Sequence, residues 1–213
     1  MNYRNTRNYE NLEKCIYDGV GEYGIPEIEP AHIDVGNCEF IPFSQAARCT
    51  QRADKGVHFF IDDYRFNRLW STPDRYLPML QQFRCVMTPD FSMYTDFPKT
   101  MQIYNHYRKH WIGAYLQENG IDVIPTIGWS DESSYEWCFD GEPAHGVVAV
   151  SSVGTQQSKR TKELFIQGYK EMVRRLEPET IIFYGNVPDE CTENIVRIRA
   201  FSEKFKEAKC NGW

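Results

Sequence analysis

Residues 84–98 read RCVMTPDFSMYTDFP, and this stretch joins a short apolar strand to a turn that carries a carboxylate. The apolar run 85–87 stops at Pro89, and Asp90 follows at once. Three aromatic residues stand close behind it in the sequence: Phe91, Tyr94 and Phe97. α/β enzymes commonly place a carboxylate at the end of a buried strand, beside apolar walls. Because Pro-Asp is also ordinary turn chemistry, both interpretations stand.

Four more apolar runs have the length and composition of buried strands. They lie at 57–61, 123–127, 146–150 and 180–184. Segments with helical character separate them, the clearest at 100–118 and 162–176. Short, nearly all-apolar strands alternating with helices predict a parallel sheet covered on both faces. We therefore expect an α/β fold with a largely parallel five-stranded sheet in a three-layer sandwich. A partial barrel is the alternative, since a full one usually needs about 250 residues.

The predicted sheet occupies only part of the chain. Residues 1–50 have weak periodicity and many glycines and prolines, so they predict an irregular N-terminal extension that wraps the core. Residues 51–213 form the predicted α/β domain, and its last segment, at about 193–208, is predicted as a helix because apolar residues recur at helical spacing.

Composition narrows the function classes. The formal net charge is -6, which counts against a protein that coats nucleic acid non-specifically. No apolar run is long enough for a membrane span, and the first residues lack the apolar core of a signal peptide. The seven cysteines are irregularly spaced, which is untypical of a disulfide framework. We expect a cytoplasmic protein without a membrane role and with reduced thiols.

The predicted strand ends carry most of the candidate site residues. In a parallel α/β sheet the site lies beyond the carboxyl ends of the strands. Three carboxylates follow such strands and are candidate catalytic groups: Asp63, Asp90 and Asp131. Candidate substrate-binding residues come from the same turns and loops: Phe91, Tyr94, Trp129, Ser151 and Asn186. Each polar residue is also a common helix-capping type, and the aromatic residues can equally form a second core.

Two basic segments are candidate phosphate-binding surfaces. One is the helix at 100–118, with His106, Lys109 and His110; the other, with Lys159 and Arg160, opens the helix at 162–176. His106 and His110 have the i, i+4 spacing of metal ligands. No Glu lies between them and neighbouring basic residues repel a cation, so we predict no metal here. The chain has no P-loop, and its one G-x-G-x-x-G match, at Gly19, Gly21 and Gly24, lies in the predicted irregular extension and not between a predicted strand and a helix. No cofactor is therefore predicted.

The motifs VHFFIDDYRF, VMTPDFSMY, IPTIGWSDESSYEWCFDG, VVAVSSVG and IIFYGN occur in this order. In these segments, over roughly residues 40–190, the chain resembles a bacterial family designated as a domain of unknown function, DUF 4417. Members of that family occur in phages and conjugative elements. The resemblance implies a setting of phage or mobile-element conflict, and it brings no catalytic residues with it.

Three functions fit these residues. The leading hypothesis is a metal-independent hydrolase of the base–sugar bond in DNA, resembling a DNA glycosylase that acts on a flipped nucleotide. Asp90 would activate water or stabilise the sugar cation, and the aromatic residues would stack the base. The second is a nuclease with Mg²⁺ on the strand-end carboxylates. The third is a phage-borne binding or inhibitor protein without catalysis.

Overall fold

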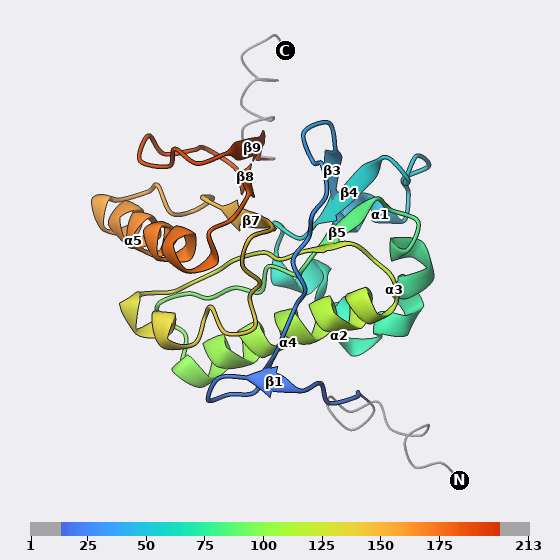
Figure 1. Cartoon of the computed structure of the whole chain (residues 1–213), viewed down its shortest axis with the longest axis horizontal. Coiled ribbons are helices and arrows are strands. Elements are labelled where there is room, and N and C mark those ends of the chain that lie inside the picture. Colours follow the sequence, from blue (N-terminus) through green and yellow to red (C-terminus); the bar gives the residue numbers. More distant parts are fainter. Residues whose placement is uncertain (1–13, 201–213) are drawn as a thin grey trace.

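The computed structural model describes residues 14–200, and its longer strands all run parallel (Figure 1). Seven strands form two parallel sheets in the order of the chain, β3-β4-β5-β6 and β7-β8-β9. Their bounds are β3 Glu39–Pro42, β4 Lys55–His58, β5 Cys85–Met87, β6 Val123–Ile124, β7 Val147–Ser151, β8 Thr180–Tyr184 and β9 Ile195–Ile198. A parallel bridge from Thr126 to Ala149 joins the two sheets. The predicted α/β class with parallel strands is confirmed, and residues 14–200 form no closed barrel.

Two of these strands were not predicted. β3 lies inside the expected irregular extension and pairs with β4, so the sheet begins before residue 51. β9 lies where we expected a helix and pairs with β8, with Ile181 opposite Ile195. The helix prediction is wrong for Ile195–Ile198, because strand pairing overrides the local spacing of apolar residues. Residues 201–208 of that predicted helix lie outside the described range.

The helices surround the strands (Figure 1). Their bounds are α1 Phe43–Ala46, α2 Asn67–Ser71, α3 Pro73–Leu80, α4 Lys99–Glu118 and α5 Lys159–Leu176. α5 buries Phe165, Tyr169 and Met172 against one face of β7 and β8. The opposite face of these strands, including Ala149 and Ile182, belongs to a larger core with α1 to α4. These packed faces fix the positions of the strand ends.

The N-terminal described segment wraps the domain, although part of it is regular. It contains a small antiparallel pair, β1 Gly19–Val20 with β2 Ile25–Pro26. The segment then runs along the domain, where the Ile28 N–H donates to the Gly141 carbonyl at 3.0 Å. Further on, the Val147 N–H donates to the Ala31 carbonyl at 2.8 Å. Its apolar residues therefore complete the core instead of forming a separate unit.

Candidate functional site

A cavity of about 970 Å³ opens at the carboxyl ends of the strands. Its walls come from both outer strands, β3 and β9, and from residues that follow β4, β5 and β7. Polar and aromatic residues used below line it: His58, Asp63, Asp90, Ser92, Ser151 and Tyr184. A cavity of this size suits a small organic ligand or one nucleotide. It is the site that the parallel topology predicts.

Asp63 and Asp90 face this cavity from neighbouring strand ends. Asp63 accepts hydrogen bonds from the backbone N–H of Ser92 at 3.1 Å and from its hydroxyl at 2.9 Å. Asn105 on α4 donates to the Ser92 carbonyl at 2.7 Å, which holds this turn in place. Burial, followed by the charge of Asp63, raises the pKa of Asp90 to about 7, and the Lys109 ammonium opposes the rise. Two of the three predicted carboxylates therefore meet.

Asp131 lies elsewhere. It precedes the 3₁₀ turn Glu132–Glu136, and its carboxylate accepts from the N–H of Ser133 at 3.0 Å and from the Ser133 hydroxyl at 2.7 Å. It is not among the residues that line the cavity. Asp131 thus caps the 3₁₀ turn, which is the alternative to a catalytic role that the sequence left open.

Of the three aromatic residues predicted to bind substrate, only Tyr94 lines the cavity. Tyr94 lines the cavity, is 60% exposed and packs edge-on against Phe97, with ring centroids 5.1 Å apart. Phe91 is instead buried, beneath the Arg108 guanidinium at 3.9 Å from its ring centroid. Trp129 packs on Phe165 of α5, with centroids 5.4 Å apart, and does not line the cavity. For Phe91 and Trp129 the structure therefore shows core packing.

Ser151 ends β7 and Asn186 comes shortly after β8, and the side chains of both already form hydrogen bonds. Ser151 is half-buried on the cavity wall, and its hydroxyl accepts from the Val153 N–H at 3.2 Å. The Asn186 side chain is exposed and accepts from Arg197 at 2.8 Å. Asn186 is not a cavity residue. Ser151 is thus the one of the two that can contact a ligand.

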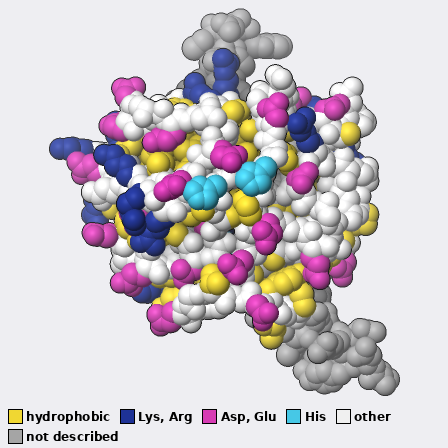
Figure 2. All heavy atoms as spheres, in the orientation of Figure 1, with side chains coloured by type: hydrophobic (Ala, Val, Ile, Leu, Met, Phe, Trp, Pro, Cys, Tyr) yellow, Lys and Arg dark blue, Asp and Glu magenta, His cyan; other side chains and the backbone are white. Residues whose placement is uncertain are grey.

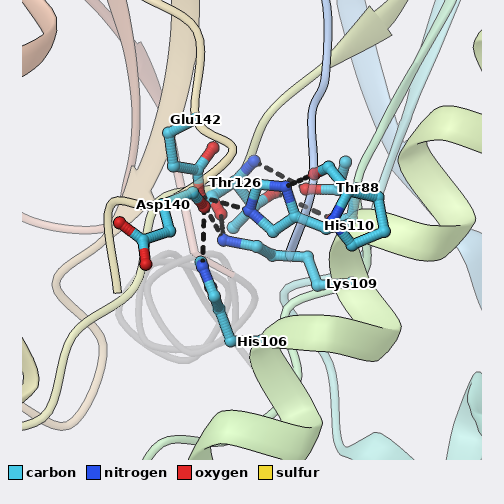
Figure 3. Close-up of polar contacts among 8 residues, drawn as sticks. Thr88, His106, Lys109, His110, Thr126, Asp140 and Glu142 are labelled. Atoms are coloured by element: carbon cyan, nitrogen blue, oxygen red, sulfur yellow. Dashed lines mark hydrogen bonds and ion pairs between the residues drawn. The ribbon is translucent and has the colours of Figure 1, made fainter. Parts of the chain in front are cut away.

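The predicted phosphate-binding face of α4 is wrong. His106, Lys109 and His110 are at most 5% exposed and point into the protein (Figure 3). Lys109 donates to the Thr126 carbonyl at 3.0 Å and forms an ion pair with the buried carboxylate of Glu142. Because these three side chains are buried, a phosphate group in solvent cannot reach them. Lys109 can be buried because the Glu142 carboxylate, 33 residues further along the chain, pairs with its ammonium group.

Buried histidines complete this cluster. A ring nitrogen of His106, Nε2, lies 3.0 Å from the Asp140 carbonyl oxygen, and Nδ1 of His110 lies 2.8 Å from the Pro26 carbonyl oxygen. Burial lowers the pKa of both imidazoles. Burial also raises the pKa of Glu142, but Lys109 and His110 outweigh it and bring that pKa below its ordinary value. The cluster is a buried polar network of Glu142, Lys109 and the two histidines, and its ion pair is Lys109 with Glu142.

Lys159 and Arg160, the other pair predicted to contact phosphate, are exposed. They begin α5, whose first turn is closed by a capping box between Ser158 and Thr161. Lys159 lies 3.7 Å from Glu163. Figure 2 shows Lys and Arg side chains gathered over α5, whereas acidic side chains are spread over the whole face.

The family model described as "Domain of unknown function (DUF4417)" matches residues 17–202. The chain belongs to this family. Relatives of this DUF4417 chain include the "Gene 1 protein" of Mycobacterium phage L5, 39% identical over 181 residues that cover 82% of this chain and 76% of that protein. The "Gene 1 protein" of Mycobacterium phage D29 is 37% identical over 174 residues, or 82% of this chain and 64% of that protein. No solved structure matches.

Four of the five motifs by which the sequence resembles DUF4417 contribute residues to the cavity wall; IPTIGWSDESSYEWCFDG contributes none. VHFFIDDYRF contains His58 at the end of β4 and Asp63, VMTPDFSMY contains Asp90 and Ser92, VVAVSSVG contains Ser151, and IIFYGN contains Tyr184. These segments therefore supply part of the candidate site in this DUF4417 chain, together with β3 and β9.

The sequence did not point to four residues of the cavity and of the buried cluster around Lys109: His58, Ser92, Glu142 and Tyr184. Tyr184 stacks on Phe60 with ring centroids 4.8 Å apart, and His58 lies 5.1 Å from the same Tyr184 ring. Both belong to predicted strands, where they pass for core residues. Ser92 and Glu142 stand in loops, and only the folded chain shows what they contact. Within residues 14–200, no helix has both the length and the apolar character needed to cross a membrane.

Proposed function

We propose that this protein hydrolyses the bond between base and sugar of a nucleotide presented by DNA. The main support for this proposal is the Asp90 carboxyl group. Its pKa is raised to about 7, and it lies on the wall of the 970 Å³ cavity beside the Asp63 carboxylate. General acid–base catalysis is most effective when the pKa lies near the working pH. Two carboxylates in different environments are a common basis for dividing acid and base roles.

In this proposal Asp90 takes a proton from the attacking water, whose oxygen bonds to the sugar C1′. The C1′–N bond breaks, and the base leaves with its electron pair and is protonated by solvent. Asp63, held by Ser92, stabilises the positive charge that develops on the sugar. Tyr184 on Phe60, and Tyr94 with Phe97, supply aromatic faces for the base. Phosphate contacts fall to Lys159 and Arg160, the predicted basic residues that are exposed.

The test uses duplexes that carry normal, damaged or modified bases, incubated with the full chain and then treated with alkali to reveal abasic sites. Wild type should give alkali-dependent strand breaks, and Asp90→Ala should remove at least about 99% of the rate, in line with the usual worth of a general base. Asp131→Ala, which alters a carboxylate away from the cavity, should keep the activity. Full activity in Asp90→Ala, or no product from any duplex, contradicts the proposal.

A metal-dependent nuclease has less support. Among residues 14–200, the strand-end carboxylates do not form a group of three potential ligands, because Asp131 lies apart from Asp63 and Asp90. Strand breaks that appear without alkali would identify this activity instead.

A binding protein is favoured by one observation, the exposure of Tyr64 and Tyr94 on the cavity rim, 73% and 60%. Exposed aromatic side chains of this kind anchor partner proteins. In that case Tyr94→Ala should abolish partner capture, whereas Asp90→Ala should leave it intact.

A further inference from the structure

The buried cluster of α4 contains a set of side chains suited to a metal ion. His106 and His110 lie one helical turn apart, and Glu142 approaches from the segment before β7 (Figure 3). One ligand atom of each of the three lies within 4.8 Å of the others. All three side chains are within the protein: His106 and His110 are 2% and 0% exposed, and the Glu142 side chain is 0% exposed.

Backbone carbonyls fix the tautomer of each ring. A carbonyl oxygen only accepts, so Nε2 of His106 and Nδ1 of His110 must carry the hydrogens that face Asp140 and Pro26. When the imidazole is neutral, the other nitrogen of each ring has a free lone pair. Histidines that ligate metals are oriented in this way, with the second ring N–H donated to a carbonyl or carboxylate.

The remaining polar atoms of the cluster are unsatisfied. Within residues 14–200, Nδ1 of His106, Nε2 of His110 and Oε2 of Glu142 are buried without a hydrogen-bond partner. Leaving buried polar atoms unpaired usually costs about 1–3 kcal/mol each. Three such atoms in one cluster, on residue types that bind metals, call for a shared partner.

The contact between His110 and Glu142 indicates that the partner of these atoms is positively charged. Nε2 of His110 lies 3.1 Å from Oε1 of Glu142. With Nδ1 as the protonated nitrogen, both atoms are acceptors and repel each other unless a proton or a cation lies between them. Tetrahedral zinc with bonds of about 2.0–2.1 Å holds its ligand atoms roughly 3.4 Å apart. The observed separation is close to that value.

Lys109 is the competing cation. Its ammonium reaches Glu142 and the Thr126 carbonyl, but it bonds to neither imidazole nitrogen. It therefore neutralises the carboxylate but gives no hydrogen bond to Nδ1 of His106 or Nε2 of His110. A divalent ion at this point has to bind against the field of the ammonium, so Lys109 weakens binding without removing any ligand.

We propose that His106, His110 and Glu142 bind a divalent transition-metal cation of the Zn²⁺ type, which ties α4 to the segment before β7. This donor set of two imidazoles and one carboxylate suits Zn²⁺ or Fe²⁺ better than Mg²⁺ or Ca²⁺, which prefer oxygen. The binding of this ion does not depend on the proposed hydrolase activity, although His106 and Asp90 line one small cavity.

The direct test is a titration of the full chain after removal of bound metal with a chelator. Calorimetry with Zn²⁺ should give one ion per chain, and Co²⁺ should give ligand-field absorption without a thiolate charge-transfer band. Glu142→Gln should weaken Zn²⁺ binding at least about tenfold, whereas His145→Ala, a change at an exposed histidine, should not. Failure to bind one ion, a thiolate band, or unchanged binding in folded Glu142→Gln would overturn the proposal.

Lys109→Met gives a second readout that leaves every ligand in place. Removing the competing ammonium should strengthen Zn²⁺ binding at least about tenfold, and Zn²⁺ should raise the melting temperature of this variant more than that of wild type. If Zn²⁺ binds Lys109→Met no more tightly than wild type, the cluster is an ion-pair network and the proposal is wrong.

Discussion

Opposing influences act on the pKa of the Asp90 carboxyl group: burial and the Asp63 charge raise it, and the Lys109 charge lowers it. The half-buried carboxyl of Asp90 lies near the Asp63 carboxylate, and both burial and that charge favour the protonated form. Lys109 favours the ionised form but does not outweigh them. Because the folded pKa is raised, the unfolded state ionises first as pH rises. Folding is therefore favoured below the unfolded pKa, near 4, and this contribution is lost between about pH 4 and pH 7.

Asp90→Asn should remove this pH dependence. At pH 3 wild type and variant should differ little, since the wild-type carboxyl is then largely protonated in both the folded and the unfolded state. At pH 8 the variant should have the larger free energy of unfolding, by about 1–2 kcal/mol, less than the full shift implies because the carboxyl is partly in contact with water. Urea denaturation at the two pH values measures the difference.

Asp63→Asn is the matched control, since it removes the neighbouring charge and keeps the shape of the side chain. It should lower the pKa of Asp90 and move the pH-dependent loss of stability to lower pH. If Asp90→Asn and wild type lose stability in parallel between pH 5 and pH 8, the titrating group is another one.

At this scale the sequence located the acid but could not show its surroundings. Asp90 was predictable because a short apolar strand stops just before it. The burial of Lys109 was not, because an amphipathic pattern cannot reveal a carboxylate 33 residues further along the chain. The i, i+4 spacing of His106 and His110 was visible, and Glu142, the third potential ligand, was not.

The role of Trp129 depends on its packing against α5. Its indole covers Gly168 in the middle of α5, and a Cβ at that position would lie 2.1 Å from the indole nitrogen. The glycine therefore serves close packing between helix and loop. A loop rich in aromatic residues predicts either a binding wall or a second core, and only the placement of α5 decides between them.

Gly168→Ala should destabilise the protein by about 1–3 kcal/mol despite the better helix propensity of Ala, because the added methyl displaces the indole. Chemical denaturation measures the loss, and Trp fluorescence should change as the indole moves. Gln167→Ala, an exposed change in the same helix, should have the opposite sign or no effect. Equal stability of the two variants would show that Trp129 can move without cost.

Long helices were predicted closely and short strands less so. The helix predicted at 100–118 is observed as Lys99–Glu118, and the one at 162–176 begins three residues earlier. β3 is four residues long and ends at Pro42, so its composition resembles that of a loop. Its pairing with β4, a tertiary contact, makes it a strand.

At the scale of the whole molecule, the two sheets meet at a narrow seam. Beside the bridge from Thr126 to Ala149, the N–H of Ile127 donates to the Ala149 carbonyl at 2.8 Å. The hydroxyl of Thr88 accepts from the N–H of Thr126 at 2.8 Å, and the Thr126 hydroxyl donates to the Thr88 carbonyl at 2.9 Å. The side chains of Thr88 and Thr126 thus support the bridge between the sheets.

Thr88→Val keeps the volume of this fully buried side chain but leaves the Thr126 N–H unpaired. The free energy of unfolding should fall by about 1–3 kcal/mol, and hydrogen exchange should accelerate at the amides of Ile127 and Ala149. Thr100→Val, at an exposed position of α4, should change neither. Protection at the seam that survives Thr88→Val would show that the backbone contacts alone hold the sheets together.

The chain-order arrangement of the seven strands has a consequence for synthesis. Each parallel strand finds its neighbour among segments that have already left the ribosome, so the sheets can grow in one direction as the chain emerges. Asp63 and Asp90 would take their places early, next to β4 and β5. The far wall of the cavity, with Tyr184 and Ile198, arrives last. A nascent chain therefore carries its carboxylate pair well before it has an enclosed space around it.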